Sequence, residues 1–183
     1  ILTLAILGGT GKLGRGLAFR WAKAGYHVII GSRTPEKAGQ AAEELNQKLE
    51  RQLIEGMGNE EAAEACDIAV LSVPYSSQQE TLASVKQQLE GKVLIAVTNP
   101  LNRQDIYAVH MPPAGSAAQE AQELLGTGTR VVTAFQNVSH RHLQHDGPVP
   151  CDVLVCGDDP AAKDQVLQLV AAAGLVGWDA GPL

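Results

Sequence analysis

The chain has 183 residues, a formal net charge of −6 at pH 7 and a pI of about 5.3. This acidic balance, with no basic stripe, argues against nucleic acid as a partner. Hydrophobic residues make up 45% of the chain and charged residues 19%, as in an ordinary globular domain, and no apolar run is long enough to imply a membrane partner. The three cysteines favour reduced thiols and a cytoplasmic protein.

Short apolar segments alternate with longer amphipathic ones along the chain. In chain order, we expect strand 2–7, helix 12–24, strand 27–32, helix 35–50, helix 60–65, strand 67–73, helix 76–89, strand 93–97, helix 116–125, strand 130–133, strand 152–156, helix 160–173 and strand 175–179. The strands lack polar alternation and most are separated by helices, which predicts a mostly parallel sheet with helices on both faces. The predicted fold class is α/β, Rossmann-like and doubly wound, as one domain over residues 1–183. The irregular segment 99–115 is expected to line a site.

A glycine-rich turn follows the first strand. Residues 9–14 read Gly-Thr-Gly-Lys-Leu-Gly, which matches G-x-G-x-x-G between a strand and a helix. Gly9 permits the tight turn, Gly11 lets a pyrophosphate approach the backbone, and Gly14 lets helix and strand pack closely. The free N–H groups and positive dipole of the helix N-terminus favour phosphate there. The alternative is a glycine turn without a ligand. The predicted pyrophosphate contacts are Gly9, Thr10, Gly11, Lys12 and Leu13.

The end of the second strand indicates which dinucleotide binds. NAD enzymes usually place an acid there for the ribose hydroxyls, and this chain has Ser32 and Arg33 instead. Arg33 can form a forked contact with a 2′-phosphate, Ser32 can donate to it, and Lys37 lies one helical turn further on. The pattern predicts NADP as the cofactor. A solvated surface pair of Arg33 and Lys37 is the alternative.

Two other strand ends face the same predicted cleft. Val73 and Pro74 end one strand, and we expect them along the path from adenosine to nicotinamide. Thr98 and Asn99 end another and are expected at the nicotinamide ribose. Since a proline follows each strand, ordinary strand-ending turns remain the alternative.

Residues 134–139 follow a third strand end and are expected to form a platform over the nicotinamide, with Ala134 and Asn137 in contact with the cofactor. No general acid–base pair stands out in the sequence. We therefore assign no catalytic residue and expect direct hydride transfer, in which the protein aligns the cofactors.

Histidines and cysteines raise the question of a metal or redox site. His140, His142 and His145 could bind a metal if the loop folds back, but Arg141 lies between them, and an exposed polar loop facing an anion is favoured. Cys151 and Cys156 are spaced to point to opposite faces of one strand, so core thiols are favoured over a redox pair. We predict no metal site.

Several segments resemble the NADPH-dependent deazaflavin reductases, the F420:NADP oxidoreductases. They are residues 7–14, residues 31–33 with Lys37, and residues 61–71, 115–118, 155–159 and 179–183. The matches run in order over nearly the whole chain, so the set is much more specific than the glycine turn alone.

The resemblance implies an enzyme that holds NADP on the glycine turn and the serine–arginine pair, and passes hydride to or from coenzyme F420. The deazaflavin is implied near residues 97–100 and 134–139. A homodimer is also implied, as are C-terminal family helices that this chain, ending at Leu183, does not contain. The alternatives are an NADPH-dependent reductase of a flavin or of a small imine or carbonyl, and an NADP-binding module without turnover.

Overall fold

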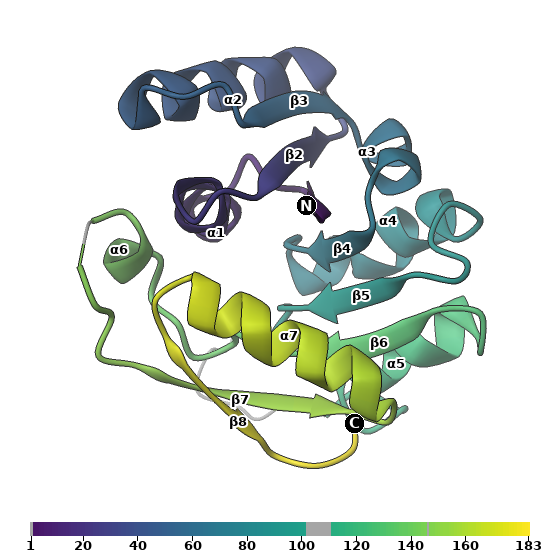
Figure 1. The fold of residues 1–183 in the computed structure, drawn as a ribbon. Coiled ribbons are helices and arrows are strands. Elements are labelled where there is room, and N and C mark those ends of the chain that lie inside the picture. Colours follow the sequence, from purple (N-terminus) through teal and green to yellow (C-terminus); the bar gives the residue numbers. More distant parts are fainter. Residues whose placement is uncertain (1, 102–110, 146) are drawn as a thin grey trace.

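The computed structural model describes residues 2–101, 111–145 and 147–183. Figure 1 shows the elements in space. They are β1 (Thr3–Leu7), α1 (Lys12–Lys23), β2 (His27–Ser32), α2 (Pro35–Leu49), β3 (Ile54–Gly58), α3 (Asn59–Ala65), β4 (Ile68–Leu71), the 3₁₀ helix η1 (Tyr75–Ser77), α4 (Gln78–Val85), β5 (Val93–Ala96), α5 (Ala117–Leu125), β6 (Arg130–Thr133), α6 (His140–Leu143), β7 (Asp152–Gly157), α7 (Pro160–Ala172) and β8 (Val176–Asp179).

Within the described residues the strands form one eight-stranded sheet in the order β3-β2-β1-β4-β5-β6-β7-β8. All neighbouring strands are parallel except β6 and β7, where Val132 faces Gly157 and Thr133 faces Cys156 in antiparallel register. The predicted α/β fold with a mostly parallel, doubly wound sheet is therefore confirmed. Because β1 lies between β2 and β4, the chain reverses its winding direction there, and ligands of such sheets bind outside the carboxyl ends of these strands.

Each face of the sheet carries its own core. Leu4 and Ile6 of β1 pack with residues of α1, α2, α6 and α7 in the larger cluster. Ala5 and Leu7 pack with residues of α3, α4 and α5 in the smaller one (Figure 1). Since both faces are covered, successive residues of β1 are all apolar, which explains why the strands show no polar alternation.

The sequence prediction missed β3 and α6. The β3 sequence, Ile-Glu-Gly-Met-Gly, has no apolar run, and β3 lies at the edge of the sheet. A Cβ at Gly56 would lie 2.2 Å from the carbonyl carbon of Ala38, so this glycine lets α2 pack directly against β3. The helix predicted over 76–89 is shorter than expected, since regular α4 ends at Val85. No helix in the described ranges combines the length and apolar character needed to cross a membrane.

Candidate functional site

The glycine turn has a tight geometry that explains two of its glycines. Gly9 donates its N–H to Ile6 O and to Gly31 O, both at 3.0 Å. A Cβ on Gly9 would lie 2.6 Å from Ile6 O. A Cβ on Gly14 would lie 2.7 Å from the Gly9 Cα, so α1 could not pack on the turn. The packing of the turn and of α1 therefore requires a glycine at both positions, whether or not a ligand binds.

Gly11 differs, because no contact among the described residues requires a glycine there. Its backbone has φ −70° and ψ 166°, an ordinary extended conformation, and an added Cβ would meet no atom closer than Gly8 O at 3.9 Å. Gly11 is exposed and caps α1, and no side chain caps the first turn. The first N–H groups of the helix therefore face outward beside a backbone free of side chains, which suits a pyrophosphate. Thr10 is half-buried, Lys12 is exposed and Leu13 is half-buried along this edge.

The end of β2 borders a cavity. Ser32 and Arg33 line a cavity of about 440 Å³, here called the β2–β3 cavity. Its other lining residues are Pro35, Gly58, Asn59, Glu60, Glu61, Glu80, Thr81 and Ser84. Arg33 is exposed and has no ion-pair partner within the described ranges, so its charge is available to a ligand. Ser32 is buried, and its Oγ accepts the Thr34 N–H at 3.1 Å, which leaves the hydroxyl hydrogen free to donate. Lys37 is exposed on α2 and does not line the cavity.

The ends of β4 and β5 border the turn on its other side. Val73 contacts the turn so closely that a Cβ on Gly8 would lie 2.3 Å from Val73 Cγ1, and Gly8 has φ +70°. Thr98 Oγ1 donates to Val73 O at 3.3 Å, which ties the two strand ends together. Pro74 and Asn99 are exposed at this edge. The structure thus brings Val73, Pro74, Thr98 and Asn99 to the same edge of the sheet, at the carboxyl ends of β4 and β5.

A second cavity, of about 270 Å³, lies between the ends of β5 and β6 and is here called the β5–β6 cavity. It is lined by Thr98, Asn99, Pro100, Met111, Pro112, Gly115, Ser116, Ala117, Ala118, Thr133, Gln136, Leu154 and Cys156. The described ends of the segment 99–115 therefore line a cavity, while residues 102–110 lie outside the described residues. Its volume is just below the roughly 300–1,000 Å³ common for small-molecule sites.

The turn after β6 corrects part of the predicted platform. Ala134 has no exposed surface and belongs to the larger core, so it offers a ligand no contact in this structure. Phe135 is equally buried, has φ +68° and packs edge to face on Trp21, with ring centroids 5.8 Å apart. Asn137 is exposed, and its Nδ2 donates to Asp152 O at 2.8 Å, which ties it to β7. The residue that reaches the β5–β6 cavity is Gln136, whose Nε2 donates to Ala96 O at 2.9 Å.

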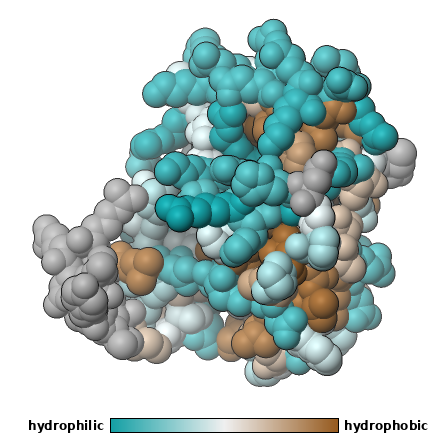
Figure 2. All heavy atoms as spheres, turned by 90° about the vertical axis from the view of Figure 1, so that its left-hand side faces the viewer, coloured by the Kyte–Doolittle hydropathy of each residue, from teal (hydrophilic) through white to brown (hydrophobic). Residues whose placement is uncertain are grey.

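The segment that contains His140, His142 and His145 is fixed through hydrogen bonds to its backbone carbonyl groups. The buried guanidinium of Arg20 donates to the carbonyl oxygens of His142 and Gly147 at 2.8 Å, Leu143 at 3.2 Å, and also His145. These bonds fix α6 on α1. The surrounding surface, on the left-hand side of Figure 1, is largely hydrophilic (Figure 2). Among the described residues no three His, Cys, Asp or Glu side chains come close enough together to hold a metal. Asp146 lies outside the described residues.

The cysteines also differ from expectation. All three are free, and Cys66 is the buried one, where burial raises the pKa of its thiol. Cys151 packs half-buried against the larger core, whereas Cys156 is half-buried at the β5–β6 cavity. The expectation of two core thiols therefore holds only in part, since Cys151 packs against the larger core without being fully buried and Cys156 lines the cavity.

The fold places the chain in the Rossmann class of doubly wound α/β domains. The model of a protein family described as "NADP oxidoreductase coenzyme F420-dependent" matches residues 3–100. An F420-dependent NADP reductase of Methanocaldococcus jannaschii is 42% identical over 176 residues, which cover 92% of this chain and 78% of that protein. The chain belongs to the family of coenzyme F420-dependent NADP oxidoreductases, as its motifs predicted.

More distant relatives share parts of this architecture. Metalloreductase STEAP3 of Rattus norvegicus is 30% identical over 177 residues, which cover 96% of this chain and 33% of that protein. The crystal structure of a suspected F420-dependent NADP reductase from Arthrobacter sp. FB24 superposes with a TM-score of 0.82 at 26% identity, covering 100% of this chain and 86% of that one.

Proposed function

We propose that this chain is an oxidoreductase that passes hydride between NADP(H) and coenzyme F420. The observation that carries the proposal is the pairing of the open Gly11 edge with Arg33, a cation that lines the β2–β3 cavity without a carboxylate partner among the described residues. One subsite suits a pyrophosphate and the other a 2′-phosphate. NADP needs both at once.

The roles of the residues follow from their positions. The glycine turn and the first turn of α1 bind the pyrophosphate through Thr10, Gly11, Lys12 and Leu13, while Gly9, whose N–H is already bonded to Ile6 O and Gly31 O, shapes the turn. Arg33 binds the 2′-phosphate with Ser32, and Lys37 adds long-range attraction from outside the cavity. When bound, the two cofactors supply the hydride donor and acceptor, so the protein contributes alignment and exclusion of water rather than an acid–base pair.

The nicotinamide end is proposed beside the β5–β6 cavity. Val73, Pro74, Thr98 and Asn99 line the route from the turn, and the cavity beyond them has both apolar and amide groups. Leu154 and Cys156 supply the apolar side and Gln136 the amide. We assign this cavity to part of the deazaflavin ring, and Asn137 to the support of its wall through β7.

The proposal has two further parts: the protein is a homodimer, and it works in a reducing, cytoplasmic compartment. Leu154, Val176 and Trp178 are 59%, 52% and 56% exposed on β7 and β8, and Leu154 is the register partner of Trp178. An exposed apolar strip of this kind supports an interface. The three free cysteines support a reducing environment.

The test mixes the full-length protein with NADPH and oxidised F420 and follows the loss of deazaflavin absorbance. We expect turnover with NADPH and little with NADH. A matched variant, Cys156→Trp, fills the β5–β6 cavity and should abolish F420 turnover while leaving the Kd for NADPH unchanged. Tight NADPH binding without turnover in the wild type would favour a flavin or imine reductase or a binding module instead. Failure to bind NADPH would overturn the whole proposal.

A further inference from the structure

Asn59 lies where the two proposed phosphate subsites meet. It is the first residue of α3 and directly follows β3. Gly58 is the register partner of Ser32, so Asn59 and Arg33 leave the sheet from adjacent strand ends. Asn59 is 8% exposed and lines the β2–β3 cavity together with Arg33.

The side-chain oxygen of Asn59 holds the start of the glycine turn. Oδ1 accepts the N–H of Gly8 at 3.1 Å, across 51 positions of sequence. To do so it passes Gly31, where a Cβ would lie 2.8 Å from Oδ1. The next residue of the turn, Gly9, donates to Gly31 O at 3.0 Å. The turn is therefore tied to the end of β2 by a backbone bond and to the end of β3 by Asn59.

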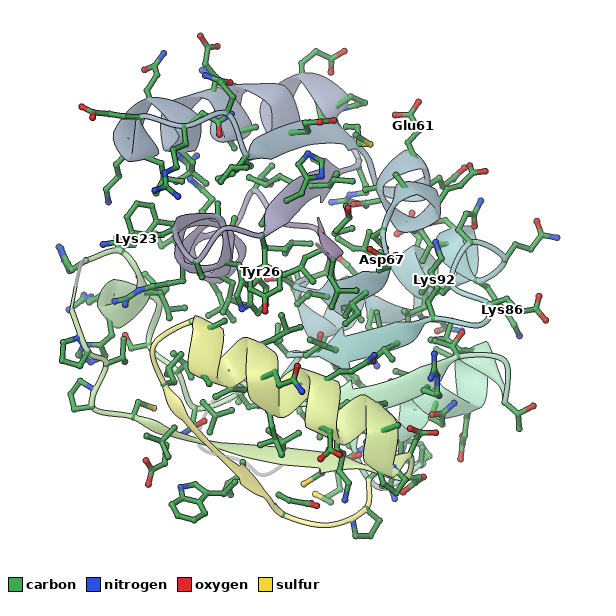
Figure 3. The ribbon with its side chains drawn as sticks, viewed as in Figure 1. Lys23, Tyr26, Glu61, Asp67, Lys86 and Lys92 are labelled. Atoms are coloured by element: carbon green, nitrogen blue, oxygen red, sulfur yellow. The ribbon has the colours of Figure 1, made fainter. Side chains whose placement is uncertain are left out.

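The start of α3 is itself fixed. Glu61, labelled in Figure 3, projects from the first turn of α3, and its Oε2 accepts the Gly58 N–H at 3.2 Å. Asn59 is thus presented to Gly8 by a helix start that cannot easily rotate. The side-chain amide of Asn59 therefore has a fixed position between the two proposed phosphate subsites.

The amide nitrogen of Asn59 is left for a ligand. Because the Gly8 N–H needs an acceptor, the oxygen must point to Gly8, and this fixes Nδ2 on the other side. No described residue accepts a hydrogen bond from Nδ2. A nucleotide with its pyrophosphate on the turn and its 2′-phosphate at Arg33 would place its adenosine ribose between them, beside this nitrogen.

We propose that Asn59 is a positioning and specificity-determining residue for the nucleotide: Oδ1 fixes the phosphate turn through Gly8, and Nδ2 donates to the 2′-phosphate of the adenosine ribose. The proposal rests on NADP as the cofactor. It adds that the preference for NADP over NAD depends on the side-chain amide of Asn59. An amide donor suits the 2′-phosphate of NADP, whereas a carboxylate at position 59 would repel that phosphate.

The variant Asn59→Asp tests this directly in the full chain. Aspartate keeps the shape and the acceptor for Gly8 but replaces the donor with a negatively charged oxygen. We expect the Kd for NADPH, measured by calorimetric titration, to rise at least about tenfold, the effect of losing a charge-assisted bond and adding a like charge. The Kd for NADH should stay the same or fall, because the carboxylate can accept from the 2′-hydroxyl.

A second variant and a control separate this role from stability. Asn59→Leu removes both contacts, so the Kd values for NADPH and NADH should both rise. Asn46 is also a buried amide, 5% exposed, and its Nδ2 donates to Ile54 O at 2.7 Å at the start of β3, whereas the β2–β3 cavity lies at the end of β3. Asn46→Asp should lower the Tm without changing the ratio of the two Kd values.

Unchanged NADPH binding in both Asn59 variants would overturn the proposal, as would an equal loss of both nucleotides in Asn59→Asp. Should Asn59→Asp fail to fold, wild-type affinities in Asn59→Leu would still overturn it. Wild-type protein that binds and oxidises NADPH separates these outcomes from a failure of the proposed function.

Discussion

Gly14 lies so close to Gly9 that a Cβ at position 14 would come within 2.7 Å of the Gly9 Cα, whereas a Cβ at Gly11 would meet nothing closer than 3.9 Å. The three glycines of one motif therefore serve two purposes. Gly9 and Gly14 allow the protein to fold, and Gly11 leaves space for a ligand.

The first prediction separates these purposes by mutation. Gly14→Ala should lower the free energy of unfolding by about 1–3 kcal/mol, because α1 must move away from the turn. Gly11→Val should change that free energy by less than about 1 kcal/mol but abolish binding of both NADPH and NADH. Urea unfolding and nucleotide titration check both. A Gly11→Val protein with normal binding would show that the turn is not the phosphate cradle.

The second prediction concerns the charge at the end of β2. Arg33→Glu should weaken NADPH binding by about 1.5–3 kcal/mol, because a charge-assisted contact with the 2′-phosphate is lost, and should barely affect NADH. Lys37→Glu is the matched control, since Lys37 is equally exposed but does not line the cavity. Its effect on NADPH should be clearly smaller. Equal losses for NADPH and NADH in Arg33→Glu would contradict the assigned role.

The third prediction concerns Arg20, which binds four carbonyl oxygens of the segment around α6. Arg20→Met retains the buried stem but leaves these carbonyls without their donor. We expect a loss of about 2–3 kcal/mol in the free energy of unfolding. The exposed Arg141 supplies the control, and Arg141→Met should be close to neutral. Similar stabilities of the two variants would mean that water replaces the guanidinium at little cost.

The fourth prediction is a pH dependence near the C-terminal motif. Hydrogen bonds from Lys163 Nζ at 2.8 Å and Gly181 N at 2.9 Å hold the pKa of the Asp179 carboxyl below its usual value. Since the folded-state pKa is the lower one, the stabilisation is present above the unfolded pKa of about 3.9 and is lost as the pH falls through the folded value.

Asp179→Asn should therefore flatten the acid end of the stability curve. Urea midpoints measured between about pH 6 and about pH 2.5 should fall less steeply for the variant than for the wild type. Asp164 is an exposed acid on α7 with no hydrogen-bond or ion-pair partner among the described residues, so Asp164→Asn is the control that removes an acid without breaking a contact. Parallel curves for Asp179→Asn and the wild type would argue against the pair with Lys163.

What the sequence determined by itself is local. The order of strands and helices, the glycine turn and the position of Arg33 could be read from the chain, because each depends on neighbouring residues and on patterns of a few positions. Arg33 directly follows β2 and Gly11 lies four residues after the end of β1, so a parallel sheet with β1 and β2 as neighbours brings both to one edge.

What the tertiary structure decided depends on residues far apart in sequence. No local pattern shows that Asn59 reaches Gly8 across 51 positions, that Arg20 binds carbonyls more than a hundred residues away, or that Ala134 is fully buried while Gln136 reaches the cavity. Nor does a local pattern predict the edge strand β3 or the left-handed backbone conformation of Phe135. The physical reason is that strand register and helix packing set these contacts, and both are fixed only when the two cores close on the sheet.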